Sequence, residues 1–125
     1  MASKNQHLWQ AEHNEEFLKS IEPLESGKFI DWEVTGLFYA GIHYIEAFLV
    51  TKKLESSSHE QRLSNMNSAG LTDDKFQNSY DCLYDWARKT RYKCISIQEY
   101  QFELIRQFYN TIKRHILKEL HKLTY

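Results

Sequence analysis

The stretch 88–93, with the sequence RKTRYK, carries four cations in six residues beside a tyrosine. Such cations can hold the phosphate backbone of a nucleic acid, and Tyr92 next to Arg91 can stack on a base. Because lysine and arginine also favour the negative end of a helix dipole, a helix C-terminus explains the same composition without a ligand. Arg88 differs from its neighbours because Asp85 precedes it by three residues. That carboxylate could orient the guanidinium for a ligand or hold it in a structural ion pair.

Tyrosine and histidine also interrupt the most apolar stretch of the chain, 34–50. Its polar positions are spaced by four, four and three residues, which places them on one helix face: Thr35, Tyr39, His43 and Glu46. A helix that is apolar on its other sides is central and buried, and its polar groups need partners. The loop that follows delivers His59 and Arg62. These two side chains could converge with Tyr39, His43 and the arginine cluster on one site; alternatively, both histidines are hydrogen-bonded core groups.

Apolar periodicity and capping residues predict four long helices and one short helix. We expect the long helices over about 4–21, 31–53, 73–92 and 96–123, and the short one over about 58–66. One proline and four glycines in 125 residues also favour long helices over many short strands. Long helices with short connections predict an all-α fold, an antiparallel up-and-down four-helix bundle with an additional short helix, in a single domain over 1–125.

The same patterns predict caps and buried faces. The expected caps are Asp31 for the central helix, Ser57 with Glu60 or Ser58 with Gln61 for the short one, and Ser96 with Glu99 for the last. The first helix is expected to bury Leu8, Trp9, Phe17, Leu18 and Ile21. The helix over 73–92 is expected to bury Phe76, Tyr80, Leu83 and Ala87. The last helix is expected to bury a stripe that includes Tyr100, Leu104, Ile105, Ile112, Ile116 and Leu123.

The composition is typical of a globular cytoplasmic protein. Hydrophobic residues make up 42%, and the net charge of −1 excludes a bulk attraction to nucleic acid or membranes while leaving room for local patches. Cys82 and Cys94 lie too far apart for a CxxC motif and are expected to be reduced thiols. The polar N-terminus is unlike a signal peptide, and the stretch 34–50 contains Glu46. We therefore expect a buried core helix and no membrane association.

No motif for a metal, a cofactor or a catalytic nucleophile stands out. A di-iron bundle needs a pair of Glu-x-x-His motifs, which the sequence lacks, and His43 with Glu46 has the reverse order. Neither a Gly-x-Ser-x-Gly motif nor a phosphate-binding glycine-rich loop occurs. We expect no metal and no cofactor.

The order of these motifs resembles the HEPN family of small helical domains from bacteria and archaea. The matching parts are FYAGIH at 38–43, AFL at 47–49, Ser58-His59, and RKTRY at 88–92, within a resemblance that spans about 31–120. The resemblance implies a bundle of four or five helices that forms a homodimer. Many members are metal-independent endoribonucleases of toxin–antitoxin, phage-defence and RNA-processing systems. Others are inactive and bind a nucleotide or a partner protein, often beside a nucleotidyltransferase.

The chain departs from the nuclease motif of that family, an arginine followed after four to six residues by a histidine. Arg88 and Arg91 have no histidine at that distance, and Arg114 with His121 fits only in the basic tail of the last helix. The departure favours a binding module for RNA, a nucleotide or a nucleotidyltransferase-type protein partner. Its expected binding groups are His59, Arg62, Arg88, Arg91 and Tyr92, with Tyr39, His43 and Asp85 beside them.

Two alternatives stay open. The first is a metal-independent endoribonuclease in which His59 takes the proton of the 2′-hydroxyl and Arg88 or Arg91 stabilises the phosphorane. A histidine pKa near neutrality suits that task. The second alternative is a purely structural helical dimer, in which the polar groups only hydrogen-bond to one another.

Overall fold

The computed structural model describes residues 1–21 and 28–123, and this part of the chain is all-helical, without a strand. It contains five helices: α1 (Lys4–Ile21), α2 (Ile30–Thr51), α3 (His59–Ser68), α4 (Asp74–Tyr92) and α5 (Glu99–Lys122). The predicted all-α class is therefore confirmed. The sequence also predicts that Pro23 and Ser26-Gly27-Lys28 end the first helix, and of these Pro23, Ser26 and Gly27 lie outside the described residues.

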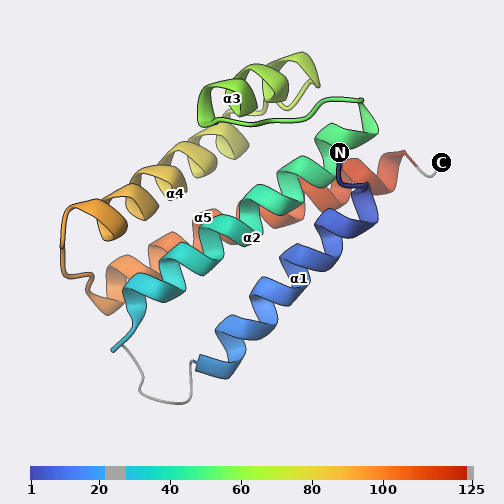
Figure 1. Cartoon of the computed structure of the whole chain (residues 1–125). Helices are drawn as coiled ribbons and strands as arrows, with labels where there is room; N and C mark the ends of the chain where they lie inside the picture. Colours follow the sequence, from blue (N-terminus) through green and yellow to red (C-terminus); the bar gives the residue numbers. More distant parts are fainter. Residues whose placement is uncertain (22–27, 124–125) are drawn as a thin grey trace.

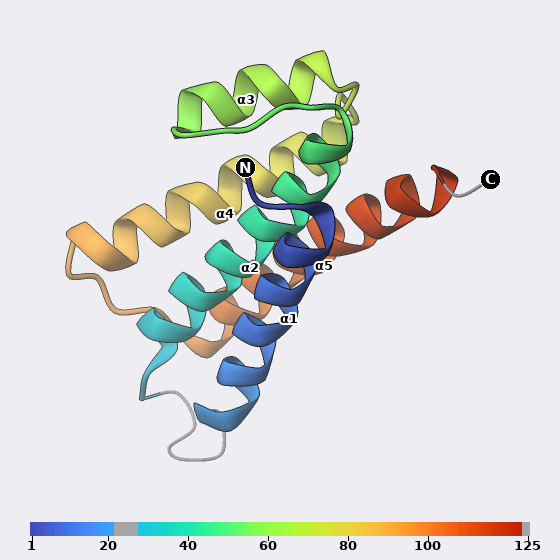
Figure 2. The same cartoon turned by 45° about the vertical axis from the view of Figure 1, so that its right-hand side comes forward.

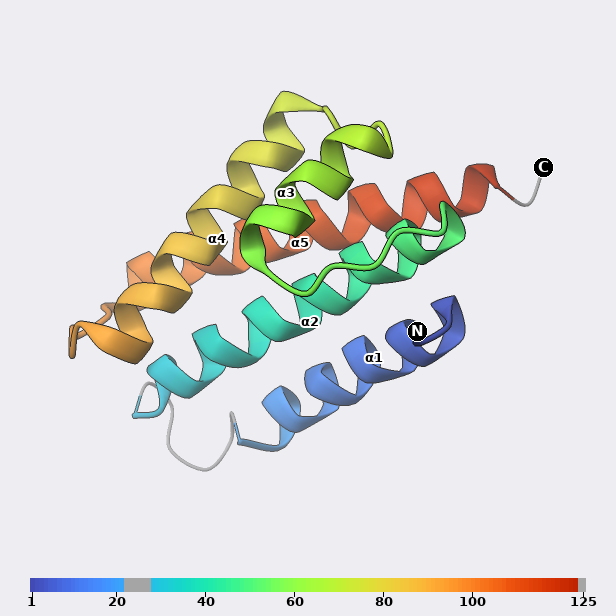
Figure 3. The ribbon, with the colours of Figure 1, turned by 45° about the horizontal axis from the view of Figure 1, so that its top comes forward.

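Helix α2 lies at the centre and packs against α1, α4 and α5, while α4 also packs against α5. Figures 1 and 2 show α1 on one side of α2, with α4 on the other side. Figure 3 shows that α2 runs back along α1 and that α5 runs back along α4. The short helix α3 lies beside α4, so its first residues can reach the middle of that helix.

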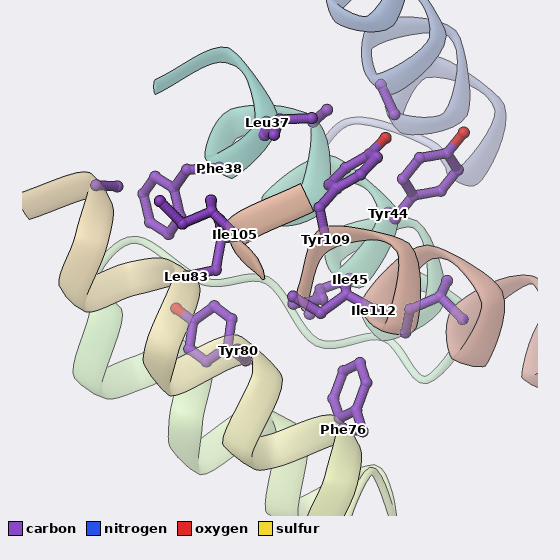
Figure 4. Close-up of a cluster of buried hydrophobic side chains, with 14 of the residues drawn as sticks. Leu37, Phe38, Tyr44, Ile45, Phe76, Tyr80, Leu83, Ile105, Tyr109 and Ile112 are labelled. Atoms are coloured by element: carbon purple, nitrogen blue, oxygen red, sulfur yellow. The ribbon is translucent and has the colours of Figure 1, made fainter. Parts of the chain in front are cut away.

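The core is built from the apolar sides of α2, α4 and α5. Figure 4 shows Ile45 of α2 among side chains of the other two helices, including Tyr80, Leu83, Ile105 and Ile112, all buried. By length and composition α2 is apolar enough to cross a membrane, but 61% of its apolar window is buried inside the bundle. Its apolarity therefore serves burial against three neighbouring helices, as the sequence predicts.

The predicted buried face is confirmed in full for α4 and only in part for α1. Phe76, Tyr80, Leu83 and Ala87 of α4 are all buried, as predicted. In α1 the prediction was wrong for Trp9 and Phe17, which are exposed, whereas the predicted Leu8 and Leu18 do pack against the core. The packed stripe is Leu8, Ala11, Glu15 and Leu18. Gly36 of α2 explains the difference in part, since a Cβ at Gly36 would lie 2.6 Å from Leu18 Cδ2. The bare glycine thus lets the Leu18 side of α1 approach α2 closely.

The predicted stripe of the last helix is confirmed only in part. Tyr100, Leu104 and Leu123 are exposed, whereas Ile105, Ile112 and Ile116 are buried as predicted. Phe102 and Tyr109 complete the buried stripe, whose members are spaced by three and four residues. That spacing keeps one helix side inward, so residues at intermediate positions face outward.

Capping residues differ from the predictions at two helices. Phe29, rather than Asp31, occupies the N-cap of α2 and gives no side-chain cap. Gln98 and Gln101, rather than Ser96 and Glu99, form the capping box of α5. At α3 the second of the two alternatives holds in part, because the Gln61 backbone N–H donates to Ser58 Oγ at 3.0 Å.

Candidate functional site

A buried tyrosine joins three helices at the first part of the site. His59 Nδ1 lies 2.9 Å from the hydroxyl of Tyr80, and Arg62 Nη1 lies 3.5 Å from the same hydroxyl. Arg62 also donates from Nε to Glu46 Oε1 at 2.9 Å. Residues of α2, α3 and α4, far apart in the sequence, thus form one polar cluster in the otherwise apolar interior. Arg62 and Glu46 neutralise each other there, so Arg62 has a structural partner.

The hydrogen bonds of Tyr80 indicate which nitrogen of the His59 ring carries the proton. Burial raises the pKa of Tyr80, although Arg62 beside it acts in the opposite direction, so the hydroxyl keeps its proton. Because a guanidinium can only donate, the Tyr80 oxygen accepts from Arg62. We assign the Tyr80 hydrogen to His59 Nδ1, since the hydroxyl then both donates and accepts. Burial, and then the charge of Arg62, lower the pKa of His59, which is therefore neutral at pH 7. A neutral ring that accepts at Nδ1 carries its proton on Nε2.

The ring of Tyr84 brings His59 and Arg88 together. The His59 and Tyr84 rings stack with centroids 3.5 Å apart and planes 4° from parallel. The guanidinium carbon of Arg88 lies 5.9 Å from the centroid of the same Tyr84 ring. Asp85 does not orient Arg88 as predicted, because its carboxylate pairs with Lys89 at 2.9 Å. The acid four residues N-terminal to the base has the better helical geometry, which explains the choice.

Arg91 occupies a cage of three aromatic rings. Its guanidinium carbon lies 5.4 Å from the Phe38 centroid, 5.7 Å from Tyr39 and 5.5 Å from Tyr92. Within the described part of the chain, its Nε and Nη1 atoms are buried and have no hydrogen-bond partner. The ring faces stabilise the cation, but they supply no acceptor for these two donors. Buried donors without a partner cost free energy, and they mark a place where an acceptor would bind favourably.

Phe38 connects the aromatic cage to the histidine cluster. Its ring lies 5.8 Å from that of Tyr84, which in turn stacks on His59. The structure therefore brings most of the predicted site residues into one connected cluster along α4, part buried and part exposed. These residues are Tyr39, His59, Arg62, Arg88, Arg91 and Tyr92.

His43 does not join that cluster through His59 but pairs with α1. Its Nδ1 atom lies 3.0 Å from Nδ1 of His7, so one ring donates its Nδ1 hydrogen to the other. Burial lowers the pKa of both rings, and their mutual proximity lowers that of His43 further. Sequence reasoning missed His7 as the partner, because a pairing across 36 positions leaves no local pattern.

A second polar network was also missed by sequence reasoning. Glu15 of α1 accepts hydrogen bonds from Tyr109 at 2.5 Å and from Lys113 at 2.8 Å, and Tyr44 lies 3.5 Å away. Burial, and then the bonded carboxylate, raise the pKa of Tyr109 far above its usual range. The network borders a cavity of about 240 Å³ between α1, α2 and α5. The network links α1 to α2 and α5. The only local feature of the sequence that indicated it is that Glu15 shares a helix side with Ala11 and Leu18.

The described residues contain no group of three histidine, cysteine, aspartate or glutamate side chains that could hold a metal ion. No family model matches the chain, and neither a curated protein nor a solved structure matches it. The likeness to HEPN domains therefore remains a prediction from the sequence motifs.

Proposed function

We propose that the chain is a HEPN-like module, an up-and-down four-helix bundle with one short added helix, that binds RNA or a nucleotide along α4 as a homodimer. The observation that carries the proposal is the pair of buried, unpartnered donors on Arg91. A phosphate oxygen supplies the acceptor that the aromatic cage lacks, and arginine binds phosphate through two parallel N–H groups.

The neighbouring groups support the same ligand class. Arg88 is an exposed cation, and the Nε2–H of His59 is a donor that makes no hydrogen bond to a described residue. Tyr92 exposes its aromatic ring beside Arg91, where a base can stack. The surface thus offers donors for phosphate and ring faces for bases.

A purely structural role explains only part of the cluster. Arg62 with Glu46, and His43 with His7, are satisfied pairs of the kind that hold helices together. Arg91 is different, because a structural arginine at this position would be expected to have a carboxylate or carbonyl partner. The binding module is the function that accounts for both kinds of residue.

Binding can be tested by titrating fluorescently labelled single-stranded RNA and, separately, a mononucleotide. Arg91→Gln is expected to weaken binding about tenfold, the effect of losing one charge-assisted hydrogen bond. A plot of log binding constant against log salt concentration has a slope of about −0.7 for each contact with a phosphate of a single strand. Arg91→Gln should therefore make the slope shallower by about 0.7. Arg114→Gln on the exposed side of α5 is the matched control. Equal affinity of the Arg91→Gln and Arg114→Gln proteins would contradict the proposal.

The second candidate is a metal-independent endoribonuclease, favoured by the placement of His59 and Arg88 on the same Tyr84 ring. As a general base His59 would need a free nitrogen, whereas its Nδ1 accepts from Tyr80 and its Nε2 carries the proton. Incubation of a mixed-sequence RNA with the protein in EDTA, beside His59→Ala and Arg88→Ala, decides between the candidates. Cleavage that both substitutions abolish would establish the nuclease; cleavage that survives His59→Ala would remove His59 from the mechanism.

The biological setting follows from the resemblance and is part of the proposal. HEPN-like binding modules belong to toxin–antitoxin and defence systems, so a nucleotidyltransferase-type protein is the partner to test. Co-purification with the product of a neighbouring gene would support that setting.

A further inference from the structure

Four large aromatic side chains are exposed on the outer side of α1 and α2. Their exposed fractions are 60% for Trp9, 51% for Phe17, 58% for Trp32 and 46% for Tyr39. Single exposed apolar residues are common on protein surfaces, but several in contact usually mark an interaction site.

These side chains belong to one continuous groove. A hollow of about 590 Å³ between the two helices is lined by Phe17, Trp32 and Tyr39, and a second of about 530 Å³ is lined by Trp9. The two hollows share Gln10 and His43 in their linings, so they adjoin. We call this surface the α1–α2 groove.

The α1–α2 groove differs in charge from the arginine surface of α4. Among the residues that line its two hollows there is no lysine, arginine, aspartate or glutamate. The polar lining groups are amides, a threonine hydroxyl and three histidines, of which His7 and His43 have a lowered pKa through burial. Nucleic acid binding needs cations along the groove, whereas protein interfaces are enriched in aromatic residues and poor in charge at their centre.

From these observations we infer that the α1–α2 groove binds the same groove of a second copy of the chain. In a two-fold symmetric interface, residues near the axis meet their own copies, so a charged groove would repel itself and an uncharged one does not. Four roughly half-exposed aromatic side chains of about 200 Å² each offer about 400 Å² of apolar surface. This is about half of the roughly 800 Å² per partner of a stable interface, and the uncharged polar groups of the lining add to it.

The inference rests on the homodimer of the proposed function and names its interface. Tyr39 links the two surfaces, because it lines the α1–α2 groove and also forms one wall of the Arg91 cage. The second copy would therefore border the RNA site at Tyr39, whereas Tyr92 and Arg88 line neither hollow of the groove.

Light scattering after size-exclusion chromatography tests the interface on the full chain. The native protein is expected to be a dimer at micromolar concentration, and Trp32→Glu is expected to raise the dissociation constant at least about thirtyfold. Tyr100→Glu, which changes an aromatic residue that is 74% exposed on α5, is the matched control and should stay dimeric. Helical circular dichroism confirms that each variant is folded.

The outcomes separate the interface from the RNA site. A native monomer at 100 micromolar (about a hundred times the concentration of a typical assay), or a Trp32→Glu protein that stays dimeric, would overturn the inference. If the Tyr100→Glu protein is monomeric and the Trp32→Glu protein is dimeric, the interface lies on α5, which would also overturn the inference. RNA binding by a monomeric native protein would leave the proposed ligand intact, whereas a Trp32-dependent dimer that binds no RNA would leave only the interface.

Discussion

Arg62 and Arg91 lie in adjoining parts of the molecule but have opposite environments. Arg62 has a carboxylate on one side and a tyrosine hydroxyl on the other, and its partner Glu46 is itself buried. Arg91 has three aromatic rings around it and no acceptor for two of its buried donors among the described residues. The two cations therefore differ in satisfaction: Arg62 is paired within the fold, whereas Arg91 has the donors that we propose a ligand accepts from.

Removing the carboxylate of the satisfied pair is expected to have the largest effect. Glu46→Ala leaves Arg62 buried without its counter-ion, which should lower the free energy of unfolding by about 3 kcal/mol or more. Urea titration followed by circular dichroism measures the change. Glu16→Ala, at an exposed position of α1, should change stability by less than about 0.5 kcal/mol. A Glu46→Ala protein as stable as the Glu16→Ala protein would show that Arg62 does not depend on this partner.

The same substitution at both arginines sharpens the comparison. Arg62→Met leaves the buried Glu46 without its ion-pair partner, so we expect a loss of about 3 kcal/mol in the free energy of unfolding. Arg91→Met loses contacts with aromatic faces but also removes two unpartnered donors, so we expect a change within about 1 kcal/mol. Equal losses in the two proteins, measured by urea titration, would mean that Arg91 has a structural role as well.

The hydroxyl of Tyr80 is expected to have an intermediate effect. Tyr80→Phe removes the hydrogen that His59 Nδ1 accepts, at a cost of about 1–2 kcal/mol in stability. Nitrogen NMR of the native protein at pH 7.5 should show His59 protonated on Nε2, and the Tyr80→Phe protein should lose that preference. A native His59 protonated on Nδ1 would reverse the assignment and restore Nε2 as a possible base.

The smallest expected effect is the pH dependence of stability. Burial lowers the folded-state pKa of His7, His43 and His59 below the ordinary value of 6.5, although Glu46 and Glu55 act in the opposite direction on His7. The unfolded state therefore binds protons more readily, so stability is complete above about pH 6.5 and falls as the pH decreases below it. Urea midpoints at pH 7.5, 6.5 and 5.5 measure the slope, which His43→Gln should reduce. A midpoint that rises on acidification would contradict the lowered pKa values.

Helices with one clear apolar stripe could be predicted from the sequence, whereas helices with two overlapping stripes could not. The buried face of α4 was predicted correctly, because Phe76, Tyr80, Leu83 and Ala87 repeat at helical spacing. In α1 a second stripe through Trp9 and Phe17 fits the period equally well, and the close approach of Leu18 to Gly36 is part of what selects the other face. Periodicity describes one helix at a time, and the choice of face depends on the neighbouring helix.

Several residues of the cluster were predicted from the sequence, but their pairings were not. The polar line of α2 required partners, and the structure supplies them: Glu46 bonds Arg62, and His43 bonds His7. The first of these partners was among the predicted site residues, while His7 was not. The cage around Arg91 needs Phe38 and Tyr39 from another helix, so no pattern within 88–93 could reveal it.

The way in which α1 packs on the other helices has a consequence for partial unfolding of the molecule. This helix packs chiefly on α2, and Ala11 is its only fully buried residue, while α2, α4 and α5 share the apolar core. Its other contacts are the half-buried Leu8 and Leu18 and two polar sets, the histidine pair and the Glu15 network, which are accessible to water at their edges. Amide hydrogens of α1 should therefore exchange with solvent at a lower free-energy cost than those of α2, through a partial opening that leaves the three-helix core folded.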